Sequence, residues 1–297
     1  MSLFQARLQQ ARIWQIRLFS RWLVRLGKVP GCRPVIEAAR PLLHPLVGYR
    51  RPFRTLREAE NAIARYSAGG HSNPDNARIH LDLAKAARPS DYAALFHMRA
   101  LLPELRHIYD FGGNAGNLYY CYSKYLDFPL DLQWSVYDLP PMLAVGRQVA
   151  NGRGERRLRF TGRWDEAAGA DLLIASGSLH YFPKPLPEMI AGLKEMPRYV
   201  LVNRTPLVEG RTAAAVQDAG SFLVACLLYN RSDLIRGFEM AGYELVDSWR
   251  AEEMAVSVPC YPEYCVPAYS GMFLRLKSTG RTTGTHLELL NYLPIQS

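Results

Sequence analysis

The chain has few cysteines and no spacing of residues that predicts a metal site. Its 297 residues include five cysteines, an odd number, and no two of them form a C-x-x-C pair. The seven histidines are scattered and form no H-E-x-x-H motif. We therefore expect neither a bound metal nor a disulfide framework, and we expect the thiols to be reduced, as in a cytoplasmic protein.

Acidic residues are almost missing from the first 54 positions. This stretch holds eleven Lys and Arg residues and a single acid, Glu37, so its net charge is +10. The whole chain carries +9, which leaves −1 for residues 55–297. A domain that acts on nucleic acid carries a basic surface of its own. The nearly neutral remainder therefore argues against nucleic acid as a partner.

The sequence also lacks an apolar run of the roughly 20 residues that a membrane-spanning helix needs, and it lacks a signal peptide. Residues 3–28 have the pattern of a basic amphipathic helix, with Arg17, Arg21 and Arg25 on one face. Such a helix can lie on an anionic membrane surface. The alternative is that it packs on its own domain or on the second subunit of a homodimer. Prolines at positions 30, 34, 41 and 45 then make residues 29–54 a connector.

The most informative stretch is residues 108–117, Ile-Tyr-Asp-Phe-Gly-Gly-Asn-Ala-Gly-Asn. It predicts a strand that ends near Asp110, a glycine-rich turn and the start of a helix, the place where doubly wound α/β domains bind nucleotide-like cofactors. A dinucleotide site of the form G-x-G-x-x-G needs glycines at positions 114 and 117, where the chain has Asn114 and Asn117. A carboxylate repels a pyrophosphate but suits a cationic ligand. A tight turn without any ligand is the alternative.

This segment resembles motif I of class I S-adenosylmethionine-dependent methyltransferases, Asp/Glu-x-Gly-x-Gly-x-Gly, and departs from it at Asn114. The resemblance implies S-adenosylmethionine as the cofactor, with Asp110 facing its methionine end. Gly112 and Gly113 are expected to let the backbone pass close to the ligand, and Gly116 to let the helix approach the sheet. Asn114 and Asn117 are expected to donate hydrogen bonds, unless Asn114 only occupies a left-handed turn conformation.

A second acid, Asp138, ends the next predicted strand, where a carboxylate can accept hydrogen bonds from ribose hydroxyls. The alternative is that it caps the following helix, and the two roles are compatible. The sequence Asp138-Leu139-Pro140 resembles the Asp-Leu-Pro motif of O-methyltransferases related to plant phenolic and bacterial polyketide enzymes. The resemblance adds Leu139 to the expected cofactor contacts.

The segment 170–182 resembles motif IV of the same enzymes, in which a Leu-His pair follows the strand. The resemblance implies that His180 is the general base that deprotonates an acceptor hydroxyl, and an imidazole can do this near neutral pH. The enzymes have an acid after this histidine, whereas this chain has Tyr181, so a cofactor contact is the alternative for His180. Ser176 and Gly177 are expected to line the cofactor. Trp164 is expected to stack on the adenine and Asp165 to reach its amino group.

Strands and helices alternate through the second half of the chain, which predicts a parallel sheet. We expect an α/β fold, a Rossmann-like doubly wound seven-stranded methyltransferase sheet with an N-terminal helical extension. The expected regions are a basic arm and connector (1–54), a helical region (55–105), the S-adenosylmethionine-binding domain (106–277) and a tail (278–297). Within them we expect helices at 55–68, 75–87, 90–102, 115–126 and 232–241, a strand at 199–203, and an apolar insertion at 212–229. Thr55 is expected to cap the first of these helices in a capping box with Glu58, and Ser232 to cap the last.

Residues 50–276 also resemble a group of bacterial methyltransferases associated with surface-polysaccharide gene clusters. We expect an S-adenosylmethionine-dependent methyltransferase that acts on a hydroxyl of a small molecule or a saccharide, in the cytoplasm or at the membrane surface. The alternatives are a non-methylating cofactor-binding or membrane-associated scaffold and an NAD-dependent oxidoreductase. The His71 loop, residues 204–229 and residues 258–269 are expected to surround the acceptor.

Overall fold

The structure is a computed structural model. It describes residues 52–64, 85–218, 223–258 and 261–277, together with position 81 and scattered positions between 19 and 38. Most of the predicted helices at 3–28 and 75–87, the His71 loop and the tail at 278–297 lie outside the described residues. In the part of the chain that is described, no helix is both long and apolar enough to cross a bilayer.

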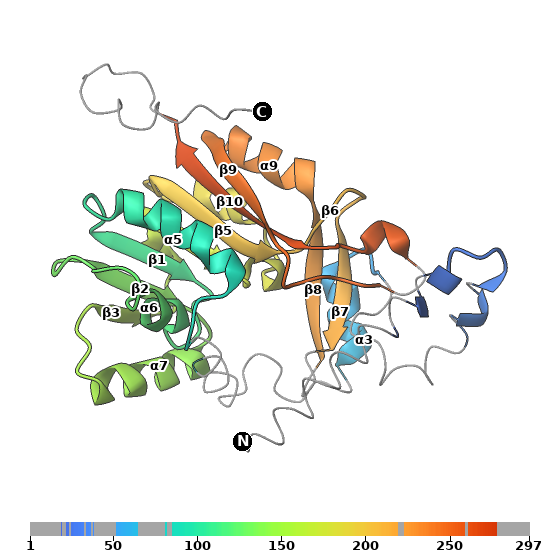
Figure 1. Cartoon of the computed structure of the whole chain (residues 1–297), viewed down its shortest axis with the longest axis horizontal. Coiled ribbons are helices and arrows are strands. Elements are labelled where there is room, and N and C mark those ends of the chain that lie inside the picture. Colours follow the sequence, from blue (N-terminus) through green and yellow to red (C-terminus); the bar gives the residue numbers. More distant parts are fainter. Residues whose placement is uncertain are drawn as a thin grey trace.

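Seven strands form the main sheet, in the order β3-β2-β1-β4-β5-β10-β9 (Figure 1). The strands are β1 (His107–Phe111), β2 (Gln133–Tyr137), β3 (Leu158–Thr161), β4 (Leu172–Ser176), β5 (Tyr199–Thr205), β9 (Tyr243–Ala251) and β10 (Tyr269–Leu276). Only β10 runs antiparallel, pairing with both β5 and β9. The strand order reverses between β1 and β4, so their carboxyl ends open the crevice in which such sheets bind ligands. The predicted doubly wound sheet is confirmed.

Helices cover both faces of this sheet. Side chains from α5 (Pro89–Leu101), α6 (Asn117–Tyr122) and α7 (Pro140–Gly152) share one apolar cluster with Ile108 and Trp134. Side chains from α8 (Leu186–Ala191) and α9 (Arg231–Met240) share the opposite cluster with Tyr109. Neighbouring residues of β1 thus point to opposite faces, as the two-residue period of a strand requires. Short 3-10 helices complete the chain: η3 (Trp164–Ala167), η4 (Leu179–Tyr181) and η5 (Pro262–Tyr264).

The predicted apolar insertion at 212–229 is a second sheet. Its strands are β6 (Leu207–Val208), β7 (Ala213–Asp218) and β8 (Leu223–Asn230), in the order β6-β8-β7. Helix α3 (Leu56–Ile63) covers one face of β7 and β8, where Ala214 and Val216 are buried. Ala215 and Leu228 are buried in another cluster on the other face. Burial on both faces explains why the segment reads as a continuous apolar run.

Two predicted helix starts have different outcomes. Thr55 caps α3 as predicted, since its Oγ1 accepts a hydrogen bond of 3.2 Å from Glu58 N. The capping box is not closed, because Glu58 Oε2 accepts its hydrogen bond from Arg54 N and not from Thr55 N. Ser232 does not cap the later helix, so that prediction is wrong. The cap of α9 is Asn230, whose Oδ1 accepts from Asp233 N at 2.8 Å. Helix α6 also begins two residues later, and ends four earlier, than the predicted 115–126.

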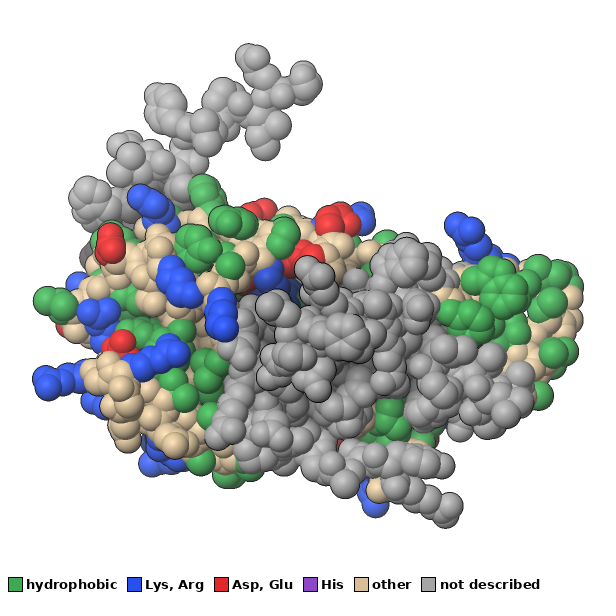
Figure 2. Space-filling view, turned by 60° about the horizontal axis from the view of Figure 1, so that its bottom comes forward, with side chains coloured by type: hydrophobic (Ala, Val, Ile, Leu, Met, Phe, Trp, Pro, Cys, Tyr) green, Lys and Arg blue, Asp and Glu red, His purple; other side chains and the backbone are tan. Residues whose placement is uncertain are grey.

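Basic side chains are unevenly spread over the described surface. On the face shown in Figure 2, Lys and Arg side chains gather at the end of the molecule that carries β3 and α7. The exposed residues of this region include Arg147, Arg153, Arg156 and Arg159. The near-zero net charge of residues 55–297 therefore conceals a local basic cluster.

Candidate active site

The glycine-rich turn after β1 is fixed to the end of β2. Gly112 N and Gly113 N both donate hydrogen bonds to Tyr137 O, at 2.8 and 3.3 Å. Gly112 has a φ of +72°, and a Cβ added there would lie 2.4 Å from Ser178 Cβ. A Cβ at Gly113 would lie 2.4 Å from the carboxyl carbon of Asp110. Side chains of the protein itself therefore leave no room for a Cβ at either position, so both glycines are needed even without a ligand.

Asp110 is the buried acid of this turn, with only 1% of its surface exposed. Trp134 Nε1 donates a hydrogen bond of 3.1 Å to Oδ2, whereas the buried Oδ1 has no partner among the described residues. Burial raises the pKa of Asp110 to about 7, against the lowering effect of the indole hydrogen bond, and the nearby Asp138 adds to the rise. A buried oxygen without a partner is costly, so Asp110 fits a ligand that supplies a donor or a positive charge.

Asp138 ties the end of β2 to the same turn. Its Oδ2 accepts a hydrogen bond of 2.8 Å from Asn114 N, and its Oδ1 accepts one of 2.6 Å from Leu139 N. Burial raises the pKa of Asp138, and these two backbone donors oppose the rise. Leu139, which is 42% exposed, occupies the N-cap position of α7. Asp138 thus bonds the turn and its own neighbour, and each oxygen keeps a lone pair for a further donor.

The two asparagines of the turn differ in their surroundings. Asn114 has a φ of +56°, and its Oδ1 accepts a hydrogen bond of 2.8 Å from Ala115 N. It therefore occupies the left-handed turn conformation that was one of its two predicted roles. Asn117 begins α6, and its buried Oδ1 has no partner within the described ranges. Gly116, with a φ of +86°, precedes it, and a Cβ there would lie 3.3 Å from Leu158 of β3.

The residues after β4 lie beside the same edge of the sheet. Ser176 Oγ accepts a hydrogen bond of 2.8 Å from Arg204 Nη2. Gly177 has a φ of +73° and donates its N–H to Asn203 O at 2.8 Å. His180 follows in η4 and is only 2% exposed. Its ring centroid lies 4.0 Å from that of Tyr181, so the imidazole is packed in the interior in the described structure.

The two residues predicted to contact the adenine have different surroundings in the structure. Trp164 lies in η3, where its ring centroid is 5.4 Å from that of Phe111 and its Nε1 donates to Met189 O at 3.3 Å. Asp165, which the sequence suggested for the adenine amino group, is exposed and pairs with Arg163 at 2.6 Å. Trp164 is partly exposed, and its stacking on adenine stays a prediction.

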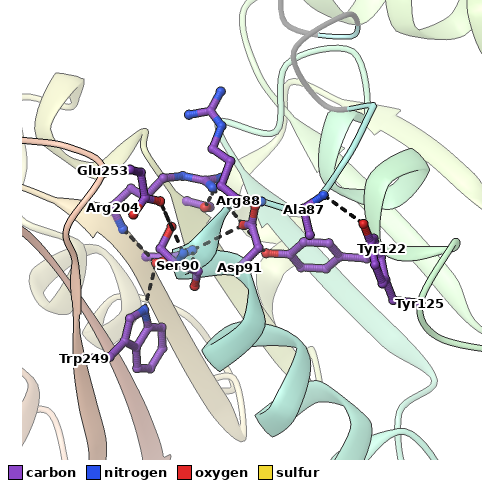
Figure 3. A network of polar contacts seen from close by, with 11 residues as sticks. Ala87, Arg88, Ser90, Asp91, Tyr122, Tyr125, Arg204, Trp249 and Glu253 are labelled. Carbon is purple, nitrogen blue, oxygen red and sulfur yellow. Dashed lines mark hydrogen bonds and ion pairs between the residues drawn. The ribbon is translucent and has the colours of Figure 1, made fainter.

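A polar network that the sequence did not predict joins the start of α5 to the ends of β4 and β5 (Figure 3). Asp91 Oδ1 lies 2.8 Å from Arg204 Nη1, and it also accepts a hydrogen bond of 2.7 Å from Tyr122 OH. Arg204 in turn reaches Ser176 and has a φ of +54°, which is rare for a residue with a long side chain. The network thus ends on a residue predicted to line the cofactor.

Two further charged residues flank this network (Figure 3). Glu253 follows the carboxyl end of β9, and its Oε1 accepts a hydrogen bond of 2.5 Å from Ser90 Oγ. The other carboxylate oxygen, Oε2, is buried and has no partner among the described residues. Arg88 precedes α5 and is half-buried. The only sequence signal for this group was the position of Asn203 and Arg204 at the end of a predicted strand.

Comparison with protein-family models finds no match, and the sequence matches no curated protein. Comparison of the fold with solved structures finds weak structural similarity to several methyltransferases. The mitomycin 7-O-methyltransferase MmcR is 17% identical with a TM-score of 0.45, over 89% of this chain and 68% of that one. NcsB1, an O-methyltransferase from neocarzinostatin biosynthesis in complex with S-adenosyl-L-homocysteine and 1,4-dihydroxy-2-naphthoic acid, is 18% identical with a TM-score of 0.38, over 63% of this chain.

A third likeness is to the 1,6-didemethyltoxoflavin-N1-methyltransferase of Burkholderia thailandensis, which is 19% identical with a TM-score of 0.38, over 64% of this chain and 91% of that one. The chain spans 57% of the length of NcsB1. Because every one of these TM-scores is below 0.5, the function is inferred from the site itself.

Proposed function

We propose that this chain is an S-adenosylmethionine-dependent methyltransferase that acts on a hydroxyl group of a small molecule or a saccharide. One observation carries the proposal. The buried Asp110 and the partly buried Asp138 stand at the ends of adjacent parallel strands, on either side of a glycine turn, and Asp110 keeps an oxygen without a partner in the described structure. Carboxylates in this position suit a cationic nucleoside and oppose a pyrophosphate.

The residues present fit such a cofactor. Asp138 is available to accept hydrogen bonds from the ribose hydroxyls, and the unmet oxygens of Asp110 and Asn117 are available to donors on the methionine end. Leu139 offers an exposed apolar side chain beside the ribose, and Ser176 with Gly177 would border the ligand at the end of β4. When bound, the cofactor supplies a methyl group activated by its sulfonium.

The protein's contribution to the chemistry would be mainly to position an acceptor hydroxyl in line with that methyl group. The hydroxyl oxygen forms the new bond to the methyl carbon, the carbon–sulfur bond breaks toward sulfur, and the hydroxyl proton leaves to a base. His180 is our proposed base. Because its ring is packed in the interior, this role requires the acceptor to reach into the layer between the two sheets, beside Tyr181.

Two other functions remain as alternatives. An NAD-dependent oxidoreductase is disfavoured by Asn114 and Asn117 in place of glycines and by the carboxylate of Asp110 in the turn. A non-methylating scaffold at a membrane surface would use the basic residues of 3–28. We place the methyltransferase in the cytoplasm or on the membrane surface, with a homodimer and a role in surface-polysaccharide synthesis as further parts of the proposal.

Transfer of labelled methyl groups from S-adenosylmethionine into a cell extract tests the proposal without knowledge of the acceptor. We expect the wild-type protein to label a discrete product. The variants His180→Ala and His180→Gln should lower labelling by roughly 10²–10⁴-fold, the range for loss of a general base, while binding of S-adenosylhomocysteine stays nearly unchanged. If His180→Ala abolishes that binding, the base assignment is wrong. Binding without any labelling by the wild type would favour the scaffold.

A further inference from the structure

Two groups of opposite charge at the start of α5 have no direct bonding partner among the described residues. Figure 3 shows the side chain of Arg88 extending away from Asp91, and its guanidinium forms no hydrogen bond or ion pair with the described part of the chain. Glu253 Oε2 is buried and likewise without a partner there. A half-buried guanidinium is free to bind an anion, and a buried carboxylate oxygen needs a donor.

The carboxylates nearest to Arg88 are bonded to other groups and make no direct contact with its guanidinium. Asp91 is nearest in the chain, but its Oδ1 is bound to Arg204 and Tyr122, and its Oδ2 accepts a hydrogen bond of 2.8 Å from the backbone N of Arg88 itself. Glu253 is held by Ser90, through both its Oγ and its N. Arg204 adds a second positive charge nearby. Burial, together with the charge of Arg204, lowers the pKa of Arg88, and the charges of Asp91 and Glu253 oppose this fall.

The location places these groups at the ligand edge of the sheet. Arg88 immediately precedes α5, whose first-turn N–H groups favour negative charge. Glu253 lies two residues beyond the carboxyl end of β9, and β9 runs parallel to β5 because both pair antiparallel with β10. The network through Asp91 and Arg204 connects this region to Ser176. The two unsatisfied groups therefore lie on the side where the proposed cofactor and acceptor meet.

We propose that Arg88 and Glu253 form a ligand subsite for a carboxylate that carries an adjacent N–H or O–H donor. The guanidinium of Arg88 binds the carboxylate with paired hydrogen bonds, a geometry that guanidinium favours. Glu253 Oε2 accepts the hydrogen bond of the adjacent ammonium or hydroxyl. An amino-acid or hydroxy-acid group has this chemistry. The proposal rests on the proposed function, since both the methionine end of the cofactor and an acidic acceptor would bring such a group.

Calorimetric titration separates these two sources. S-adenosylhomocysteine contains the amino-acid group, and 5′-methylthioadenosine has the same nucleoside without it. If the cofactor supplies the group, Arg88→Met and Glu253→Gln should each weaken binding of S-adenosylhomocysteine by about 10–100-fold, the effect of a hydrogen bond to a charged group. Binding of 5′-methylthioadenosine should not change. Arg88→Lys should recover only part of the loss, because it restores the charge without the planar fork.

If an acceptor supplies the group, binding of S-adenosylhomocysteine stays unchanged. The same variants should then lower labelled methyl transfer into the extract fraction that an anion-exchange column retains. Arg156→Met serves as the matched control, because Arg156 is an exposed arginine before β3, and it should behave as the wild type in both assays.

The proposal is overturned if both variants match the wild type in binding and labelling. It is also overturned if they weaken both nucleosides equally, which would indicate a structural role. A wild-type protein that binds neither nucleoside contradicts the proposed function instead. Circular dichroism of each variant confirms that it is folded before titration.

Discussion

Asp91 on α5 and Arg204 at the end of β5 form a buried ion pair, with 2.8 Å between Oδ1 and Nη1 and with less than a tenth of either side chain exposed. The pair joins a helix that precedes the main sheet in the sequence to the edge at which doubly wound sheets bind ligands. Because Arg204 also holds Ser176, the ion pair links the stability of the fold to the shape of the site.

Removal of one partner should be strongly destabilising, because it leaves the other charge buried and unpaired. We expect Asp91→Ala to lower the free energy of unfolding by about 3–5 kcal/mol, measured by urea denaturation. The control is Asp165→Ala, which breaks an exposed pair with Arg163. That variant should keep the midpoint of the wild type, because exposed pairs contribute little. Equal midpoints for both variants would contradict the structural role of the buried pair.

The glycine turn gives a second prediction. Gly113→Ala places a Cβ 2.4 Å from the carboxyl carbon of Asp110, and this overpacking should cost about 1–3 kcal/mol of stability. Gly152→Ala is the matched control, because a Cβ there meets no described atom within 4 Å. We expect this control to be neutral or to stabilise by up to about 1 kcal/mol. Thermal unfolding of the two variants under identical conditions decides the matter.

The pKa of Asp110 predicts a pH dependence of stability. In the folded protein this pKa is about 7, whereas the ordinary value is 3.8. The carboxyl therefore stays protonated in the folded state while it ionises in the unfolded state, and stability is lost as the pH rises from about 4 to about 7. A shift of this size corresponds to about 4 kcal/mol.

Asp110→Asn removes this titration. The stability of the wild type relative to this variant should fall as the pH rises from 4 to 7 and stay level above that range. Urea denaturation at several pH values measures it. A difference that is constant with pH, or that grows as the pH rises, would show that the carboxyl is not kept protonated by burial.

The sequence predicted the main sheet because each of its strands follows a local pattern. Apolar runs at the strands, and glycine or acid at their ends, are signals within a few residues, and Asp110, Asp138 and Ser176 all stand at the strand ends where they were expected. The second sheet was missed because β7 and β8 are buried on both faces. Such strands lack the alternation that distinguishes a strand from another apolar segment.

The polar network was missed for a different reason. Asp91 and Arg204 are 113 positions apart, and neither residue belongs to a local motif. Their pairing depends on how α5 packs on the sheet, which the sequence alone does not specify. The same holds for Arg88 and Glu253, whose unsatisfied groups become apparent only when burial and hydrogen-bond partners are known.

The most direct test of the central claim is calorimetric titration of the purified protein with S-adenosylmethionine, S-adenosylhomocysteine and NAD, beside the variant Asp138→Ala. We predict micromolar binding of the first two, no binding of NAD, and an affinity reduced by at least about tenfold in the variant, the effect of one lost hydrogen bond to a charged group. Binding of NAD alone, or S-adenosylhomocysteine binding that Asp138→Ala leaves unchanged, would contradict the account.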